Sequence, residues 1–337
     1  MSQLAQELDA QPIPTLRARR EFIPDLSSVR VAVIGDVMLD VYVHGTTRLS
    51  GESGRPITVF RESGVTTHRP GGAANAAANA AALCGAATVY GLIGNDLAGN
   101  ILMREVARLG VKPRLVAISR RVTTEKRRYV TDRGGCVFRV DVETVTPVGD
   151  GDAPCLAPTR REMLHAILIS DYGKGVVTEA LVKEIMATCR GVIVVDPKGR
   201  DWAKYRGATL ITPNLDEAGE RLSSSLPDAP DDLCQALASG LPGTSVLLKL
   251  GAKGAYLWDA ATKIGTKIAA HQVLRPDAIG AGDTVAAAVT VGLGAGMSLL
   301  DAAIFANAAA AVAVSKPWTA TVTADEVRAA LCRMEPS

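Results

Sequence analysis

The stretch "VRVAVIGDVMLD", residues 29–40, indicates the fold class. It opens as a continuous apolar run rich in valine, which then meets a glycine and the acids Asp36 and Asp40. A strand that is apolar on both faces is typical of a parallel sheet covered by helices on each side. We therefore expect an α/β domain that begins at residue 29, with residues 1–28 as an appended arm.

Strand-like and helix-like segments alternate through the rest of this domain. Helices are expected at 74–83, 99–109 and 178–188, and strands at 87–93, 166–169, 192–195, 209–212 and 245–249. Such alternation predicts three α/β/α layers around a mainly parallel central sheet. The domain then spans 29–330, and a short tail follows at 331–337.

Two stretches, at about 41–62 and 120–145, depart from this pattern because their apolar and polar residues alternate with period two. That period is typical of half-buried strands, and "DRGG" (132–135) is a good hairpin turn. The two stretches therefore predict a small antiparallel β flap beside the main sheet.

The predicted flap is locally basic. It carries Arg48, Lys126, Arg127, Arg128 and Arg139. A solvated basic face is the ordinary interpretation of such a set. If the flap covers a site, one or two of these side chains could instead clamp a phosphate on the substrate.

Composition and charge narrow the class of function. With 37 Lys plus Arg against 35 Asp plus Glu, the charge demands neither nucleic acid nor an anionic membrane as partner. The apolar runs fall short of the roughly 20 residues that span a bilayer, and the first residues lack the pattern of a secretory signal. Six scattered cysteines without a CxxC pair suit reduced thiols. We expect a cytoplasmic enzyme or binding protein.

The string "AIGAGDTVAAAV" (278–289) places glycines directly before an acid and a helix-like run. The backbone amides of Gly280, Ala281 and Gly282 would lie at a helix N-terminus, where they can bind an anion. Asp283 beside them makes chemical sense as a base that accepts a hydroxyl proton during phosphoryl transfer. The alternative is that Asp283 merely caps the helix after a glycine turn.

The string "RPGGAANAAANAAALCGA" (69–86) contains a second glycine turn before a helix. Gly71 and Gly72 permit close approach of a ligand, and Asn75 can hydrogen-bond to sugar hydroxyls. A glycine turn that simply leads into a tightly packed alanine helix is equally consistent with this string.

Polar residues follow two strands in "VVDPKGRDWAKYRGATLITPNLDEAGE" (194–220). Ligands of open α/β sheets bind beyond the carboxyl ends of the strands, so Asp196, Lys198, Asn214 and Glu217 should face one crevice. Asn214 and Glu217 are three residues apart at a helix start and could hold a hydrated Mg²⁺. An N-cap with its capping-box acid is the alternative.

Three strings in this order, "GGAAN", "TPNLDE" and "GAGD", resemble the ribokinase-type (PfkB) carbohydrate kinases over roughly residues 30–327. Within that family, "GDVMLD", "RPGGAAN", "SDYGKG" and "DPKGRDWAKYRGATLITPN" are most similar to the kinases of the ADP-heptose pathway. Those kinases phosphorylate D-glycero-D-manno-heptose 7-phosphate at the anomeric oxygen.

The resemblance implies ATP and Mg²⁺, a ribokinase-like fold and a kinase domain over 29–330. It implies that Asp283 is the base and that the amides of Gly280–Gly282 form the anion hole. Implied sugar contacts are Asp40, Gly71, Gly72 and Asn75, and candidates for the sugar's phosphate are Lys126, Arg128 and Lys174. Implied nucleotide and metal contacts are Lys198, Asn214, Glu217, Lys249, Gly251 and Asn307.

The resemblance also implies a homodimer that pairs through the flap, and it leaves a monovalent cation open. The chain departs from the usual heptose kinase strings at Ile279, where "TGAGDT" is usual, and at "SGESGRPI", where "SPEAPVPV" is usual. The alternatives are a kinase for another sugar, an aminocyclitol or a nucleoside, and a catalytically silent sugar-binding protein.

Overall fold

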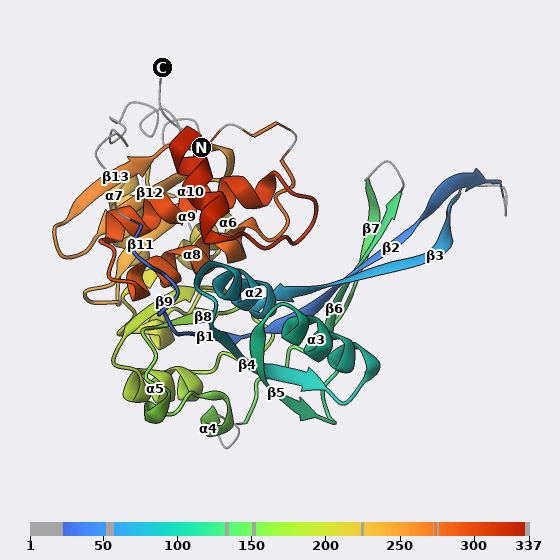
Figure 1. The fold of residues 1–337 in the computed structure, drawn as a ribbon, viewed down its shortest axis with the longest axis horizontal. Coiled ribbons are helices and arrows are strands. Elements are labelled where there is room, and N and C mark those ends of the chain that lie inside the picture. Colours follow the sequence, from blue (N-terminus) through green and yellow to red (C-terminus); the bar gives the residue numbers. More distant parts are fainter. Residues whose placement is uncertain are drawn as a thin grey trace.

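The computed structural model describes residues 23–333, apart from 52–56, 132–134, 150–152, 224–225, 272 and 275. Most of the expected arm and tail therefore lie outside the described residues, as do residues 132–134 of the "DRGG" turn. Figure 1 shows helices on both faces of a central sheet, and a second sheet that projects away from this body.

The central sheet has the strand order β13-β12-β11-β10-β9-β8-β1-β4-β5. The neighbouring pairs from β11 to β5 are parallel, whereas β12 pairs antiparallel with β11 and β13. This is the mainly parallel sheet that the alternating segments predict. Its strands are β1 Val31–Gly35, β4 Ala87–Gly94, β5 Val111–Ile118, β8 Ala166–Ser170, β9 Val192–Asp196, β10 Leu210–Ile211, β11 Ser245–Lys249, β12 Ala255–Asp259 and β13 Ile264–Ile268.

The two faces of the sheet bury separate apolar cores. Val31 and Val33 enter one core, while Ala32 and Ile34 enter the other, which explains why β1 is apolar at every position. Helices of the first core are α2 Ala73–Cys84, α3 Leu97–Arg108, α8 Ala281–Gly294, α9 Leu299–Val314 and α10 Ala324–Arg333. On the second face lie α4 Ala153–Leu156, α5 Glu179–Thr188, α6 Leu215–Leu222 and α7 Pro230–Leu237. Short 3₁₀ turns are η5 Arg160–Glu162, η6 Ala203–Tyr205 and η7 Gly251–Lys253.

The projecting sheet is the flap, and its strand order is β3-β2-β6-β7. Its strands are β2 Val37–Ser50, β3 Ile57–Gly72, β6 Thr124–Thr131 and β7 Cys136–Val142. The pairs β2-β3 and β6-β7 are antiparallel as expected, but β2 and β6 pair in parallel. They do so because both strands leave the body in the same direction, β2 directly after β1 and β6 after β5 (Figure 1).

The chain changes from one sheet to the other at Asp36. A Cβ atom on Gly35 would lie 1.9 Å from the carbonyl oxygen of Ser170, so only glycine fits this crossing. The strand β1 ends at Gly35 as expected, but Asp40 does not mark its end, because Asp40 lies within β2 of the flap.

Candidate active site

The N-terminus of α8 forms the centre of the site. Its N-cap is Gly280, which has φ 77°. A Cβ atom there would also lie 2.7 Å from Asn75 Nδ2, so both the backbone and the space favour glycine. Ala281 and Gly282 open the helix, and the Ala281 amide donates to the carbonyl of Ala278 at 3.3 Å. The expected helix N-terminus is therefore present, with Asp283 in its first turn.

Asp283 is buried and receives two hydrogen bonds. Asn75 Nδ2 donates to Oδ2 at 2.8 Å, and the hydroxyl of Tyr172 donates to Oδ1 at 2.5 Å. Burial raises the pKa of Asp283 to about 7, although both donors lower it. A carboxyl group with a pKa near neutrality is well matched to accept a proton from a substrate hydroxyl.

Two residues make hydrogen bonds to Asp283 that the sequence did not predict. Asn75, which was expected to bind sugar hydroxyls, donates a hydrogen bond from its amide to Asp283. Tyr172 lies in "SDYGKG", the polar string that follows the expected strand 166–169, and no role was expected for this tyrosine. One acid, a tyrosine and two glycines after a strand were the available signal, but they do not reveal where the hydroxyl points.

The "SDYGKG" loop is held by buried carboxylates. Asp36 accepts the backbone N–H groups of Tyr172, Lys174 and Val176 at 2.8, 3.0 and 3.1 Å. Asp171 accepts bonds from Lys204 Nζ at 2.6 Å and from the hydroxyl of Tyr205 at 2.7 Å. Asp36 follows β1 as expected, and its carboxylate organises this loop.

The glycine pair before α2 serves close packing around the flap. A Cβ atom on Gly71 would lie 2.8 Å from Asp40 Oδ2, and one on Gly72 would lie 2.6 Å from the carbonyl oxygen of Asp36. Asp40 in turn forms a buried ion pair with Arg128, at 2.6 Å between Oδ1 and Nη1. Gly71, Gly72, Asp40 and Arg128 meet at the base of the flap, beside the helix that carries Asn75.

The cations proposed for a substrate phosphate differ in their surroundings. Arg128 pairs with Asp40, and Lys174 Nζ lies 2.7 Å from Glu143. Lys126 Nζ lies 5.2 Å from the centre of the Tyr172 ring, and burial lowers its pKa. Lys126 is therefore the cation of this set that lies against a residue in contact with the base.

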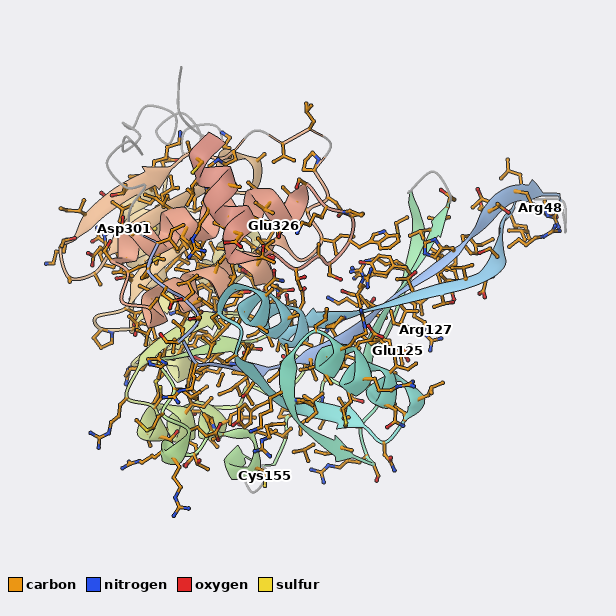
Figure 2. The ribbon with its side chains drawn as sticks, viewed as in Figure 1. Arg48, Glu125, Arg127, Cys155, Asp301 and Glu326 are labelled. Atoms are coloured by element: carbon orange, nitrogen blue, oxygen red, sulfur yellow. The ribbon has the colours of Figure 1, made fainter. Side chains whose placement is uncertain are left out.

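The other basic residues of the flap lie away from Asp283 or are paired locally. Figure 2 labels Arg48 at the far end of the flap, and Arg127 beside Glu125. Arg127 forms two bonds of 3.0 Å with Glu125, and Arg139 donates to Asp141 at 2.9 Å.

Asn214 and Glu217 form the reciprocal capping box that was the alternative interpretation. Glu217 N–H donates to Asn214 Oδ1 and Asn214 N–H donates to Glu217 Oε2, each at 2.8 Å. Burial raises the pKa of Glu217. Lys198 Nζ lies 3.9 Å from Glu217 Oε1 and 3.6 Å from Glu220, so the predicted Lys198 and Glu217 are neighbours.

Lys249 lies between two acids, Asp196 and Glu217, and the N-terminus of α8. Its Nζ atom lies 2.6 Å from Asp196 Oδ1, and a Cβ atom on Gly282 would lie 3.4 Å from it. Burial alone would lower the pKa of Lys249, but the charges of Asp196 and Glu217 outweigh that effect and raise it. The ammonium group is therefore a fixed positive charge beside the N-terminus of α8.

The remaining predicted residues, Gly251 and Asn307, follow Lys249 in the sequence. Gly251 begins η7 with φ 60°. Asn307 on α9 donates its amide to the carbonyl of Ala269 at 2.7 Å, so α9 holds the segment that follows β13. Within the described parts of the chain, no group of three or more His, Cys, Asp or Glu side chains could hold a metal ion.

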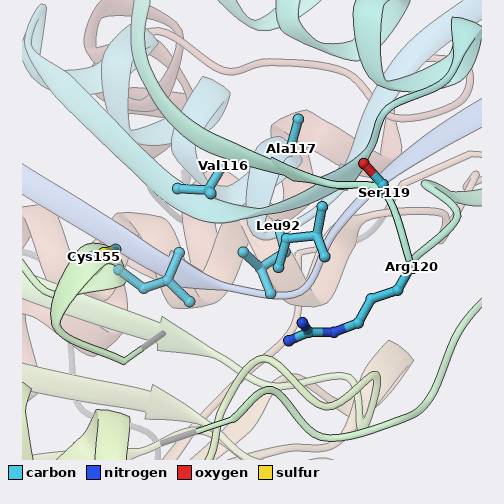
Figure 3. Close-up of a pocket in the computed structure, with 8 residues that line it drawn as sticks. Leu92, Val116, Ala117, Ser119, Arg120 and Cys155 are labelled. Carbon is cyan, nitrogen blue, oxygen red and sulfur yellow. The ribbon is translucent and has the colours of Figure 1, made fainter. Parts of the chain in front are cut away.

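A separate cavity of about 490 Å³ lies between β4, β5 and α4. Figure 3 shows Leu92, Val116, Arg120 and Cys155 on its walls. Among the described residues, its lining includes no predicted site residue and no carboxylate. The expected site residues gather instead at the N-terminus of α8 and the base of the flap.

The sequence pattern of the pfkB family of carbohydrate kinases matches residues 29–325. The chain belongs to this family. Among curated relatives, it is 39% identical over 315 residues to the bifunctional protein HldE of Shewanella amazonensis and 40% identical over 320 residues to that of Halorhodospira halophila. Each alignment covers 92% of this chain and 65% of the relative, so the chain spans about 65% of the length of these proteins.

Solved structures give the same fold. The ribokinase of Thermotoga maritima superposes with a TM-score of 0.69 at 21% identity, over 90% of this chain and 99% of that one. Phosphofructokinase-2 of Escherichia coli in complex with potassium gives a TM-score of 0.72 at 20% identity, over 90% and 98%. Among the described residues, none of the helices has both the length and the apolar character needed to cross a membrane.

Proposed function

We propose that this chain is an ATP-dependent kinase that phosphorylates D-glycero-D-manno-heptose 7-phosphate at the anomeric O1, giving the 1,7-bisphosphate. The observation that carries the proposal is Asp283, a buried carboxyl group with a pKa of about 7 at the N-terminus of a helix. The choice of heptose rests on the resemblance of "RPGGAAN", "SDYGKG" and "DPKGRDWAKYRGATLITPN" to heptose kinases and on the HldE relatives.

In the proposed reaction, Asp283 accepts the proton of the anomeric hydroxyl as its oxygen attacks the γ-phosphorus of ATP. The bond from that phosphorus to the bridging oxygen breaks, and ADP leaves with the electron pair. The amide of Gly282 and the ammonium group of Lys249 lie where they can stabilise the charge on the transferred phosphoryl group. Lys249 is then a phosphate contact, closer to the reaction than the adenosine contact expected from resemblance.

The donor set fits a magnesium ion that is held mainly by nucleotide phosphates and water. Mg²⁺ commonly uses only one or two protein carboxylates in phosphoryl-transfer sites. Glu217 offers one carboxylate, which Asn214 orients through the capping box. Bound there, the ion would neutralise charge on the phosphates of ATP. Assays with and without K⁺ test for a monovalent cation.

We assign the 7-phosphate of the sugar to Lys126. Arg128 and Lys174 each hold a carboxylate at 2.6 and 2.7 Å, so they would have to break an ion pair to bind a ligand. Lys126 lies on the flap strand next to Asp40 in register and against Tyr172. It can therefore meet an anionic substrate that enters between the flap and α8.

A second copy of the chain is the proposed occupant of the outer flap surface. Phe60, Tyr129 and Phe138 form an aromatic cluster across the flap, with ring centres 4.3 to 6.1 Å apart. Phe138 is 44% exposed and Leu49 is 74% exposed. Apolar side chains gathered on one exposed sheet are typical of an interface. The proposed dimer works in the cytoplasm, where ATP and reduced thiols coexist.

The test is an ADP-release assay with Mg²⁺ and ATP across heptose 7-phosphate, sedoheptulose 7-phosphate, fructose 6-phosphate, ribose and adenosine. A strong preference for heptose 7-phosphate supports the proposal. Turnover of another acceptor alone keeps the kinase chemistry and removes the heptose assignment. No turnover of any acceptor, together with sugar binding that needs no ATP, favours a silent sugar-binding protein.

A further inference from the structure

Tyr172 is a residue in contact with the proposed base for which neither the family match nor the relatives supply a role. Its hydroxyl donates to Asp283 Oδ1 at 2.5 Å, while Asn75 Nδ2 donates to the other oxygen at 2.8 Å. The two donors come from separate elements, the loop after β8 and the helix α2, and they hold both oxygens of one carboxylate. Each oxygen keeps one further lone pair, so a substrate hydroxyl can still donate to it.

The position of Tyr172 is imposed by buried contacts. Its backbone N–H donates to Asp36, which is 1% exposed and also holds Lys174 and Val176 of the same loop. A Cβ atom on Gly72 would lie 3.4 Å from Tyr172 Cε2, so the ring packs against the start of α2. The hydroxyl is thus aimed at Asp283 by the fold, and its direction does not depend on a freely rotating loop.

We propose that Tyr172 is a positioning residue for the general base: its hydroxyl fixes the plane of the Asp283 carboxylate and favours the ionised form that accepts the substrate proton. This inference rests on the proposed kinase function, because it assigns a role at the same site. Lys126 Nζ of the flap lies 5.2 Å from the centre of the phenol ring, which places the flap beside this residue.

Removing the hydroxyl should change the pH dependence of turnover in a defined direction. The hydrogen bond from Tyr172 lowers the pKa of Asp283, so its loss raises that pKa further. The other charges near Asp283 are Asp196, Lys249 and Lys126, and Glu217 lies near Tyr172; none of them is altered by the change. A bond from a neutral donor to a carboxylate corresponds to a shift of about one to two pH units.

The experiment compares kcat/KM for heptose 7-phosphate across pH in the wild-type chain, in Tyr172→Phe and in Tyr90→Phe. Tyr90 is a matched control, because its hydroxyl also donates to a carboxylate at 2.5 Å, that of Glu162, outside the site. We expect the acid limb of Tyr172→Phe to move to higher pH by about one to two units, with activity regained in alkaline solution. Tyr90→Phe should keep the wild-type limb.

A uniform loss of activity at every pH, with the limb unmoved, overturns the proposal, since that is the effect of a merely structural residue. Replacement of Tyr172 by 3-fluorotyrosine keeps the shape but strengthens the donor, so its limb should move to lower pH. If the wild-type chain turns over no acceptor, the proposed function fails separately. In that case, infrared difference spectra with Asp283→Asn as the reference follow the protonation of Asp283 across pH. The same titration in the wild type and in Tyr172→Phe would refute the inference.

Discussion

Replacing the proposed base should make the protein more stable, and increasingly so as the pH rises. Burial raises the pKa of Asp283 from its ordinary value of 3.8 to about 7. As the pH rises between these values, the unfolded chain releases its proton while the folded chain retains it, which favours unfolding. Once the pH is above both values, a pKa shift of this size lowers the free energy of unfolding by roughly 4 kcal/mol. Asp283→Asn has no charge to bury, and its amide can still pair with Asn75 and Tyr172.

The measurement is the free energy of unfolding from urea titrations at about pH 5, 6, 7 and 8, for the wild type and the variant. The variant's advantage should grow with pH and level off above about 7, at roughly 2–4 kcal/mol. Its turnover should fall by a factor of roughly 10² to 10⁴. Asp325→Asn, at a side chain 91% exposed, controls for the lost charge and should show no such slope. Parallel stability curves for wild type and Asp283→Asn would refute the buried, proton-holding base.

Three further predictions follow from the same geometry. Lys126→Met should raise KM about tenfold or more for a phosphorylated sugar and far less for a neutral one, and equal effects would contradict a phosphate contact. Lys249→Met leaves Asp196 as a buried carboxylate without its ionic partner, with only the Thr212 hydroxyl still donating to it. Stability should therefore fall by about 3–5 kcal/mol in urea titrations and kcat by roughly tenfold or more, whereas normal kcat would exclude a phosphoryl contact. Phe138→Asp should yield monomers in analytical ultracentrifugation, whereas Met163→Asp, at an exposed residue outside the flap, should not.

The parts of the site that the sequence predicted are those built by one local segment. Glycines before an acid and a helix-like run specify the N-terminus of α8, and Gly280 and Asp283 occupy the expected places there. The capping box of Asn214 and Glu217 is likewise a pattern of three residues. Alternating apolar segments predicted the sheet for the same reason, because each strand shows its own burial pattern.

The parts that the sequence missed arise where distant segments meet. Asn75 and Asp283 are 208 positions apart, and Tyr172 and Asp283 are 111 apart. The pairing of Asp40 with Arg128 depends on the parallel register of β2 and β6, which a prediction of simple antiparallel hairpins does not contain. Donor direction and strand register are properties of the assembled fold, so no local string reveals them.

Contacts between distant segments also help to distinguish a kinase from a catalytically silent relative. The string "GAGD" can be intact while the pKa of its aspartate varies, because that pKa is the balance of burial against the two donors from α2 and the β8 loop. Burial without donors would hold Asp283 protonated at neutral pH, and donors without burial would leave a weaker base. Under the proposed function, the competence of the site therefore depends on Asn75 and Tyr172 as well as on the motif itself. Asp36 extends that dependence to the first strand of the sheet, since it fixes the loop that aims the tyrosine.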